Sequence, residues 1–299
     1  MKRLAAAPRA LTPLALAAAA LALIVPSGAV ARRSDLLLAL LVLVTALGIG
    51  AGELRDDLRR HSISIAILSV VPLVVLSLAA WAIGRPFGAE VRDGLLAVGA
   101  SSAEVATVGL VALAGADATI ALGAVAGSLV LSALLGPVAI AVLAGHSLHG
   151  GTGHVLGRFA IVVVAPLIVG VAARTLAPRI ARVDPEREGV AALTLAALVY
   201  AALSGTAGAR GLASALLAAL AFLVVAAALG ELWRRTTPRP VGVPGALSIA
   251  MRDFAVAAAL ASQAFGSAAG GVPGVYGVVM LVAGSAATGL VARRTRGVS

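Results

Sequence analysis

Long apolar runs separated by short polar connectors dominate this chain. A run of about 20 mostly apolar residues is the length that a helix needs to cross a bilayer core. Charged and turn-forming residues gather in the connectors, for example in the stretches 53–61, 146–154 and 178–188. The pattern predicts an all-α membrane protein with about ten transmembrane helices. The predicted spans are residues 11–30, 35–52, 62–83, 91–114, 117–144, 158–176, 189–207, 211–231, 243–266 and 272–292.

Composition agrees with lipid as the main solvent of the chain. Hydrophobic residues make up 61% of the sequence and charged residues 12%, about half the charged fraction typical of a soluble domain. The sequence has no cysteine, which excludes disulfides, thiolate metal ligands and a cysteine nucleophile. All four histidines fall in stretches interpreted as connectors, so we expect no cofactor, no confident metal site and no enzymatic activity.

The net charge of +10 is spread as pairs and triplets of arginine between the apolar runs. Nucleic-acid binding needs a continuous basic face, so this distribution argues against a nucleic-acid partner. With ten spans, most of the basic residues fall on the side that holds both termini, which predicts cytoplasmic termini. Lys2 is the single lysine, and together with the abundant alanine and glycine it indicates a bacterial inner-membrane protein of a high-GC genome.

The first predicted span has a second interpretation. Residues 1–31 combine a basic start, an apolar stretch and the small-residue segment Ala29–Ala31, which are features of a cleavable signal peptide. We favour a retained span, because its removal would leave an odd number of helices.

Ten helices can divide into two repeats of five that insert with opposite topology, as in many secondary transporters. The expected organisation is one transmembrane domain over residues 1–299, with repeat 1 at about 11–145 and repeat 2 at about 158–292. The segment Gly99–Ser102 resembles Gly245–Ser248, and the two lie in the fourth and ninth spans. These spans are therefore predicted to be a corresponding pair.

The same two spans carry ionisable residues well inside them: Glu104 in the fourth, Arg252 and Asp253 in the ninth. A charged side chain at a helix centre costs about 3 kcal/mol on insertion scales, so each must meet a partner or water. Small polar residues beside such charges predict discontinuous helices. If the two spans cross, Glu104 is the expected partner of Arg252. Either this pair is structural, or the charges form a substrate or proton site, which is the usual role of intramembrane ionisable residues.

Hydroxyl side chains near these charges are the second set of candidate site residues. They can bind a carboxylate or sulfonate, or they can bond their own helix backbone and neighbouring helices. Asp117 immediately precedes an apolar run and is predicted to cap a helix. The hydroxyl candidates are Ser101, Ser102, Thr107 and Ser248.

Five segments together resemble the bile acid:sodium symporter family, within the larger bile/arsenite/riboflavin transporter group. The resemblance implies ten helices, a panel domain, a core domain, and fourth and ninth helices that are broken where they cross. It extends over most of the chain. The segments are Ala46–Gly50 before Glu53–Arg55, Gly94–Gly99, Leu113–Ala118, Ser128–Val130 with Gly136–Pro137, and Met251–Ala255.

The chain departs from that family where sodium is bound. Residues Ser102–Glu104 replace a Pro-Gly-Gly segment, and Thr107–Val108 replace Ser-Asn. The family's sodium-binding residues align with Ser248, Arg252 and Asp253, and another with Ile67. Sodium prefers several converging oxygens, so an aliphatic and a cationic residue at these positions speak against sodium coupling.

The expected function is secondary active transport of a small organic anion by alternating access. Arg252 would attract the anion, and Glu104 or Asp253 would carry a proton in place of the family's sodium. Na⁺ and H⁺ both stay open as the coupling ion. The alternative is a membrane sensor or partner subunit of the same fold that transports nothing.

Overall fold

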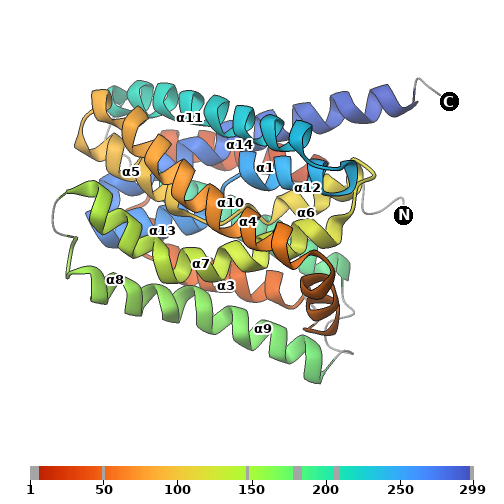
Figure 1. Ribbon diagram of the computed structural model, residues 1–299. Coiled ribbons are helices and arrows are strands. Elements are labelled where there is room, and N and C mark those ends of the chain that lie inside the picture. The colour runs from red at the N-terminus through yellow and green to blue at the C-terminus, as the bar shows by residue number, and fades with distance from the viewer. Residues whose placement is uncertain (1–6, 49–50, 146–147, 178–183, 205–208, 297–299) are drawn as a thin grey trace.

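The structure is a computed structural model that describes residues 7–48, 51–145, 148–177, 184–204 and 209–296 (Figure 1). Within these ranges the regular elements are helices, joined by short connectors. A 3₁₀ turn at Arg85–Phe87 follows α4, and a π-helical turn at Ala160–Val164 joins α8 to α9. The first half contains α1 Ala7–Ile24, α2 Gly28–Ala31, α3 Ser34–Ala46, α4 Ala51–Gly84, α5 Ala89–Ala100, α6 Ala106–Leu113 and α7 Ala118–Ala144. The second half contains α8 Thr152–Phe159, α9 Ala165–Leu176, α10 Asp184–Ser204, α11 Ala209–Thr236, α12 Arg239–Ala250, α13 Phe254–Phe265 and α14 Ser267–Arg296.

The prediction of an all-α membrane protein agrees with these helices. Within the described residues, each range predicted as a span lies mainly on helix. Three of the ranges are interrupted: 11–30 between α1 and α2, 91–114 between α5 and α6, and 243–266 between α12 and α13. Four stretches are long and apolar enough to cross a bilayer by themselves, and the other described apolar helices are shorter. The four are His61–Phe87, Ala118–Ala144, Thr152–Leu176 and Gly211–Thr236.

The helices pack in two sets of neighbours. In the first, α1 lies against α10, and α3 lies against both α9 and α10. In the second, α4 lies against α5 and α7, α11 lies against α12 and α14, and α13 lies against α14. The sets meet where α14 contacts α1 and α10 and where α13 contacts α3, α8 and α10. Figure 1 shows α8 and α9 along one edge of the bundle and α11 along the opposite edge.

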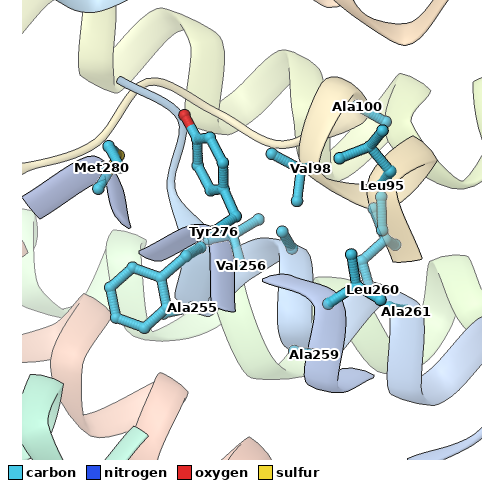
Figure 2. Close-up of a cluster of buried hydrophobic side chains, with 14 of the residues drawn as sticks. Leu95, Val98, Ala100, Ala255, Val256, Ala259, Leu260, Ala261, Tyr276 and Met280 are labelled. Carbon is cyan, nitrogen blue, oxygen red and sulfur yellow. The ribbon is translucent and has the colours of Figure 1, made fainter. Parts of the chain in front are cut away.

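Buried apolar side chains of α5, α13 and α14 form the centre of the second set (Figure 2). Leu95 and Val98 of α5 pack near Val256 and Leu260 of α13, and all four side chains are fully buried. Close approach of α4 to α5 requires glycine at Gly99, where a Cβ atom would lie 2.8 Å from the Cα atom of Ser77. This packing fixes the end of α5 and the start of α13.

Asp117 caps α7, as the sequence predicted. Its Oδ1 atom accepts hydrogen bonds from the backbone N–H of Thr119 at 2.9 Å and from the Thr119 hydroxyl at 2.6 Å. The hydroxyl bond in particular stabilises the ionised carboxylate, so the pKa of Asp117 is lowered from its ordinary value.

Candidate functional site

The first helix break lies between α5 and α6. The helix α5 ends at Ala100, and Ser101 is extended, with φ −74° and ψ 170°. Two serines one turn apart on α7 bind the backbone groups that the break leaves without helical partners. The Ser128 hydroxyl accepts from the Ala103 N–H at 3.0 Å, and the Ser132 hydroxyl donates to the Ala100 carbonyl at 2.7 Å. These bonds supply the hydrogen-bond partners that lipid cannot, so they make irregular backbone tolerable inside a membrane protein.

The second break lies between α12 and α13, and Tyr276 of α14 has the corresponding role there. Its hydroxyl accepts from the Arg252 N–H at 3.0 Å and donates to the Ala250 carbonyl at 3.3 Å. Figure 2 shows the Tyr276 hydroxyl oxygen pointing away from the apolar cluster towards the extended chain. Asp253 caps α13, because its Oδ1 atom accepts from the N–H groups of Ala255 and Val256 at 2.9 and 3.0 Å.

The two breaks cross and pair as a short antiparallel bridge centred on Ala103 and Arg252. The Glu104 N–H donates to the Met251 carbonyl at 2.9 Å, and the Asp253 N–H donates to the Ser102 carbonyl at 2.8 Å. The predicted interruption and crossing of the fourth and ninth spans are therefore observed. In this bridge, Ser102 lies opposite Asp253.

The bridge also decides which side chains share a face. Successive residues of an extended chain point to opposite faces, and residues directly opposite each other share one. Arg252 therefore shares a face with Ala103, while Glu104 and Asp253 lie on the other face. The expected hydrogen-bonded pair of Glu104 with Arg252 is wrong for this reason: no guanidinium nitrogen of Arg252 has a hydrogen-bond partner.

Buried polar atoms without partners are concentrated at this crossing. Leaving such an atom unsatisfied costs about 1–3 kcal/mol, and more for a charged group, so these atoms are the candidates for binding water, an ion or a polar solute. Ser101 differs from the other candidates, because its hydroxyl donates to the Val98 carbonyl of its own helix at 2.8 Å. The unpartnered atoms at the crossing are Ser102 Oγ, Glu104 Oε2, Thr107 Oγ1, Ser248 Oγ and the three guanidinium nitrogens of Arg252.

A cavity of about 440 Å³ lies between α2, α3, α8, α10 and α13. One face of α13 forms its wall through the small residues Ala255, Ala258, Ala259 and Ser262. The lining residues of α13 run from Ala255 to Gln263, about 12 Å at 1.5 Å per residue. The cavity thus follows α13 from its first turn to the level of Asp35 in α3 and Arg158 in α8.

A polar cluster of three side chains stands at the far end of this cavity. Arg158 of α8 forms an ion pair with Asp35 of α3, with 2.6 Å between Nη2 and Oδ2. Gln263 of α13 donates from Nε2 to Asp35 Oδ1 at 3.2 Å. The cluster connects the two sets of helices, because α3 and α8 belong to one side of the cavity and α13 to the other.

Comparison with known proteins identifies the family. A family model described as the SBF-like CPA transporter family matches residues 10–280. The chain belongs to this family. No curated protein matches the chain. Membership confirms the resemblance to bile acid:sodium symporters and makes the chain one of a family of membrane transporters.

In this SBF-like chain, two of the positions that the sequence analysis aligned with sodium ligands differ in their surroundings. Ser248 is buried at the crossing, whereas Ile67 of α4 has 38% of its surface exposed on the outside of the bundle. The aligned position in α4 therefore contributes no group to the crossing. Sequence reasoning also missed Asp35 and Arg158 as site residues, because each lies at a span boundary, where charge is expected.

Proposed function

We propose that this member of the SBF-like family is a secondary active transporter that moves a small organic anion across a bacterial inner membrane by alternating access. The observation that carries the proposal is the crossing of two broken helices, which holds a buried and unpartnered guanidinium. Broken helices that expose polar groups near the middle of the membrane are the form that substrate and ion sites take in such transporters.

Helix packing supports a repeat of five plus five, with repeat 1 at about 11–145 and repeat 2 at about 158–292. The contact of α1 with α10 mirrors that of α9 with α3. The contacts of α4 with α5 and α7 mirror those of α11 with α12 and α14. In this proposal α1, α3, α8, α9 and α10 are the panel domain, and α4 to α7 with α11 to α14 are the core domain. Rocking of the core against the panel exposes the crossing to each side in turn.

Arg252 is the residue that attracts the anion, and it also supplies a fixed positive charge where sodium would bind in relatives. It is fully buried, and its three guanidinium nitrogens are free to bind a carboxylate or sulfonate. A sodium ion bound nearby would be repelled by the positive charge of Arg252 and would find too few oxygen ligands. Both effects disfavour sodium as the coupling ion.

The two carboxylates on the opposite face of the bridge are the candidates for the coupling group. Glu104 and Asp253 are both buried, and they share the face from which Arg252 is absent. Asp253 Oδ1 is already bonded to two backbone N–H groups, whereas Glu104 Oε2 has no partner. Glu104 is therefore the carboxylate that takes up and releases the coupling proton.

The cavity opens on the side opposite to the termini in the ten-span topology. Arg32 and Asp35 line it, and both follow the first predicted span, so cytoplasmic termini place them outside. In this arrangement the structure is open towards the outside of the cell.

Thermal unfolding of the purified full-length protein with small organic anions, at two pH values and with or without sodium, tests this function. We expect stabilisation by an anion that depends on pH and ignores sodium, and uptake of that anion into proteoliposomes driven by a pH gradient. Stabilisation that requires sodium would overturn proton coupling. Absence of any anion binding and uptake would overturn the transport of organic anions.

A further inference from the structure

Asp35, Arg158 and Gln263 form a polar cluster across the boundary between the two sets of helices. Asp35 of α3 and Arg158 of α8 pair within the proposed panel, where the Nη2 and Nε atoms of Arg158 lie 2.6 and 2.8 Å from Oδ2 of Asp35. Gln263 of α13, in the proposed core, donates from Nε2 to Oδ1 of the same carboxylate at 3.2 Å. One carboxylate therefore binds groups of both domains at once.

The bond between Gln263 and Asp35 requires one particular position of the core relative to the panel. An ionised carboxylate only accepts hydrogen bonds, so the amide nitrogen of Gln263 is the end that meets it. Arg158 holds the carboxylate with two nitrogens, which fixes the place of the acceptor. A length of 3.2 Å is at the long end of the usual range, so a displacement of about 1 Å breaks the bond.

The contact of α10 with α14, elsewhere on the same boundary, is of a different kind. There Ala202 and Leu203 of the panel lie against Gly274 of the core, and a Cβ atom at Gly274 would lie 2.9 Å from the Cβ atom of Ala202. Contacts between small apolar groups have no preferred direction, so they persist when packed helices slide by about 1–2 Å. The polar cluster is therefore the contact that depends on the position of the domains.

The cluster also lies along the way into the cavity. All three residues line the cavity, which opens away from the termini in the ten-span topology. Exposure falls from 51% of the Arg158 side chain and 21% of the Asp35 side chain to 8% of Gln263. The cluster thus runs inward from the surface of the protein. Ala258 and Ala259 line the cavity further along α13, towards its first turn.

We infer that Asp35, Arg158 and Gln263 are the outer gate of the transport path. The inference rests on the proposed function and adds a regulation of the same path. The bond from Gln263 to Asp35 holds α13 against α3 at the entrance, and Arg158 is a positioning residue because it acts through Asp35. A contact made only while the outer ends of core and panel are close favours the states in which they are close. Loss of the bond therefore shifts the protein towards states that are open wider to the outside.

An introduced thiol measures this opening without background, because the sequence has no cysteine. Ala258→Cys places the thiol in the cavity wall. Its rate of alkylation by a membrane-impermeant maleimide, added to the full-length protein in spheroplasts, reports how often the cavity is open to the outside. Gln263→Met keeps the length of the side chain and removes its bond to Asp35. We expect alkylation to become about three- to tenfold faster, the change in equilibrium that the loss of one hydrogen bond produces.

A double variant separates this bond from general loosening of the protein. Asp35→Ala removes the acceptor, so adding Gln263→Met to it should change the alkylation rate no further. Thr175→Val removes an exposed hydroxyl that is bonded within α9, and it is the control that should keep the rate of the parent protein. An unchanged rate in Gln263→Met, or the same acceleration by Gln263→Met with and without Asp35, would overturn the inference.

Cross-linking tests the gate in the closed direction. In a protein with Asp35→Cys and Gln263→Cys, a short and reducible bifunctional methanethiosulfonate joins core to panel, and uptake should stop until the link is reduced. The same reagent on Asp35→Cys with Arg158→Cys joins two helices of the panel, so uptake should stay as it was before the reagent was added. Continued uptake while core and panel are linked would refute the gate.

The alkylation assay needs no solute, so the gate and the proposed function can fail separately. If Gln263→Met accelerates alkylation but no anion is bound or carried, the opening between α3 and α13 stands and the transport of organic anions fails. If anions are carried and the alkylation rate is unchanged, transport stands and the gate fails.

Discussion

Glu104 and Arg252 lie on opposite faces of the antiparallel bridge at which the two broken helices cross. The bridge pairs Ala103 with Arg252, and alternation along the extended chain sends the side chains of their neighbours to the other face. Positive and negative charges are therefore separated by the backbone itself instead of neutralising each other. In the proposed function, this separation leaves the guanidinium available to an anionic solute and a carboxylate available to a proton.

Replacement of Arg252 tests whether its charge is there for function. Arg252→Met keeps a long, flexible side chain and removes a fully buried charge that has no hydrogen-bond partner. Because an unpartnered buried charge is costly, we expect the free energy of unfolding to rise by about 2 kcal/mol while uptake into proteoliposomes is lost. Thermal unfolding in detergent measures the first effect. Failure of the variant to accumulate in the membrane would instead show that Arg252 is structural.

Glu104→Gln tests the coupling group. The amide keeps the size and hydrogen-bonding capacity of the side chain but cannot carry a proton. We expect exchange of labelled solute across proteoliposomes to persist while accumulation driven by a pH gradient is lost. Asp253→Asn is the matched control, because asparagine still caps α13 through its side-chain oxygen. Gradient-driven accumulation by Glu104→Gln at the level of the parent protein would move the coupling proton to another group.

The sequence predicted the two helix breaks because the evidence for each break lies within one predicted span. Ionisable residues inside the ranges 91–114 and 243–266, beside small polar residues, are incompatible with a continuous helix in lipid. The prediction of an Asp117 cap rested on the same kind of local evidence. Its carboxylate needs only the N–H two residues later, and this bond is observed.

Contacts between distant residues were not accessible in this way. Gln263 and Asp35 are 228 positions apart, and the sequence around neither residue predicts their contact. The register of the crossing was not predicted, because the match of Gly99–Ser102 with Gly245–Ser248 concerns corresponding positions of two repeats and does not say which residues lie opposite each other. Only the folded backbone shows that Arg252 and Glu104 face apart.

The buried Tyr276 hydroxyl should contribute more to the free energy of unfolding than the hydroxyl of an exposed tyrosine, because it binds two backbone groups at the second break. Tyr276→Phe leaves the buried N–H of Arg252 without its acceptor, and we expect a loss of about 1–3 kcal/mol in the free energy of unfolding. Tyr200→Phe is the matched control. The Tyr200 hydroxyl donates to the Val25 carbonyl at 2.6 Å in an exposed setting, where water can replace the lost bond. Equal thermal destabilisation of the two variants would contradict the role given to Tyr276.

Ser132 offers the same test at the first break, with a control of identical chemistry. Ser132→Ala leaves the Ala100 carbonyl at the end of α5 buried and without its partner from α7. Ser77→Ala also removes a buried serine hydroxyl, but Ser77 donates to the Leu73 carbonyl within its own helix, which retains its place in the helical ladder. We expect Ser132→Ala to lose about 1–3 kcal/mol of stability and Ser77→Ala less than about 1 kcal/mol.

Uptake should fall in Ser132→Ala alone, because the shape of the break determines where Glu104 lies. If both variants unfold at the same temperature and transport equally well, the bond between α7 and the break is dispensable, and the position of Glu104 is set by the bridge to Met251.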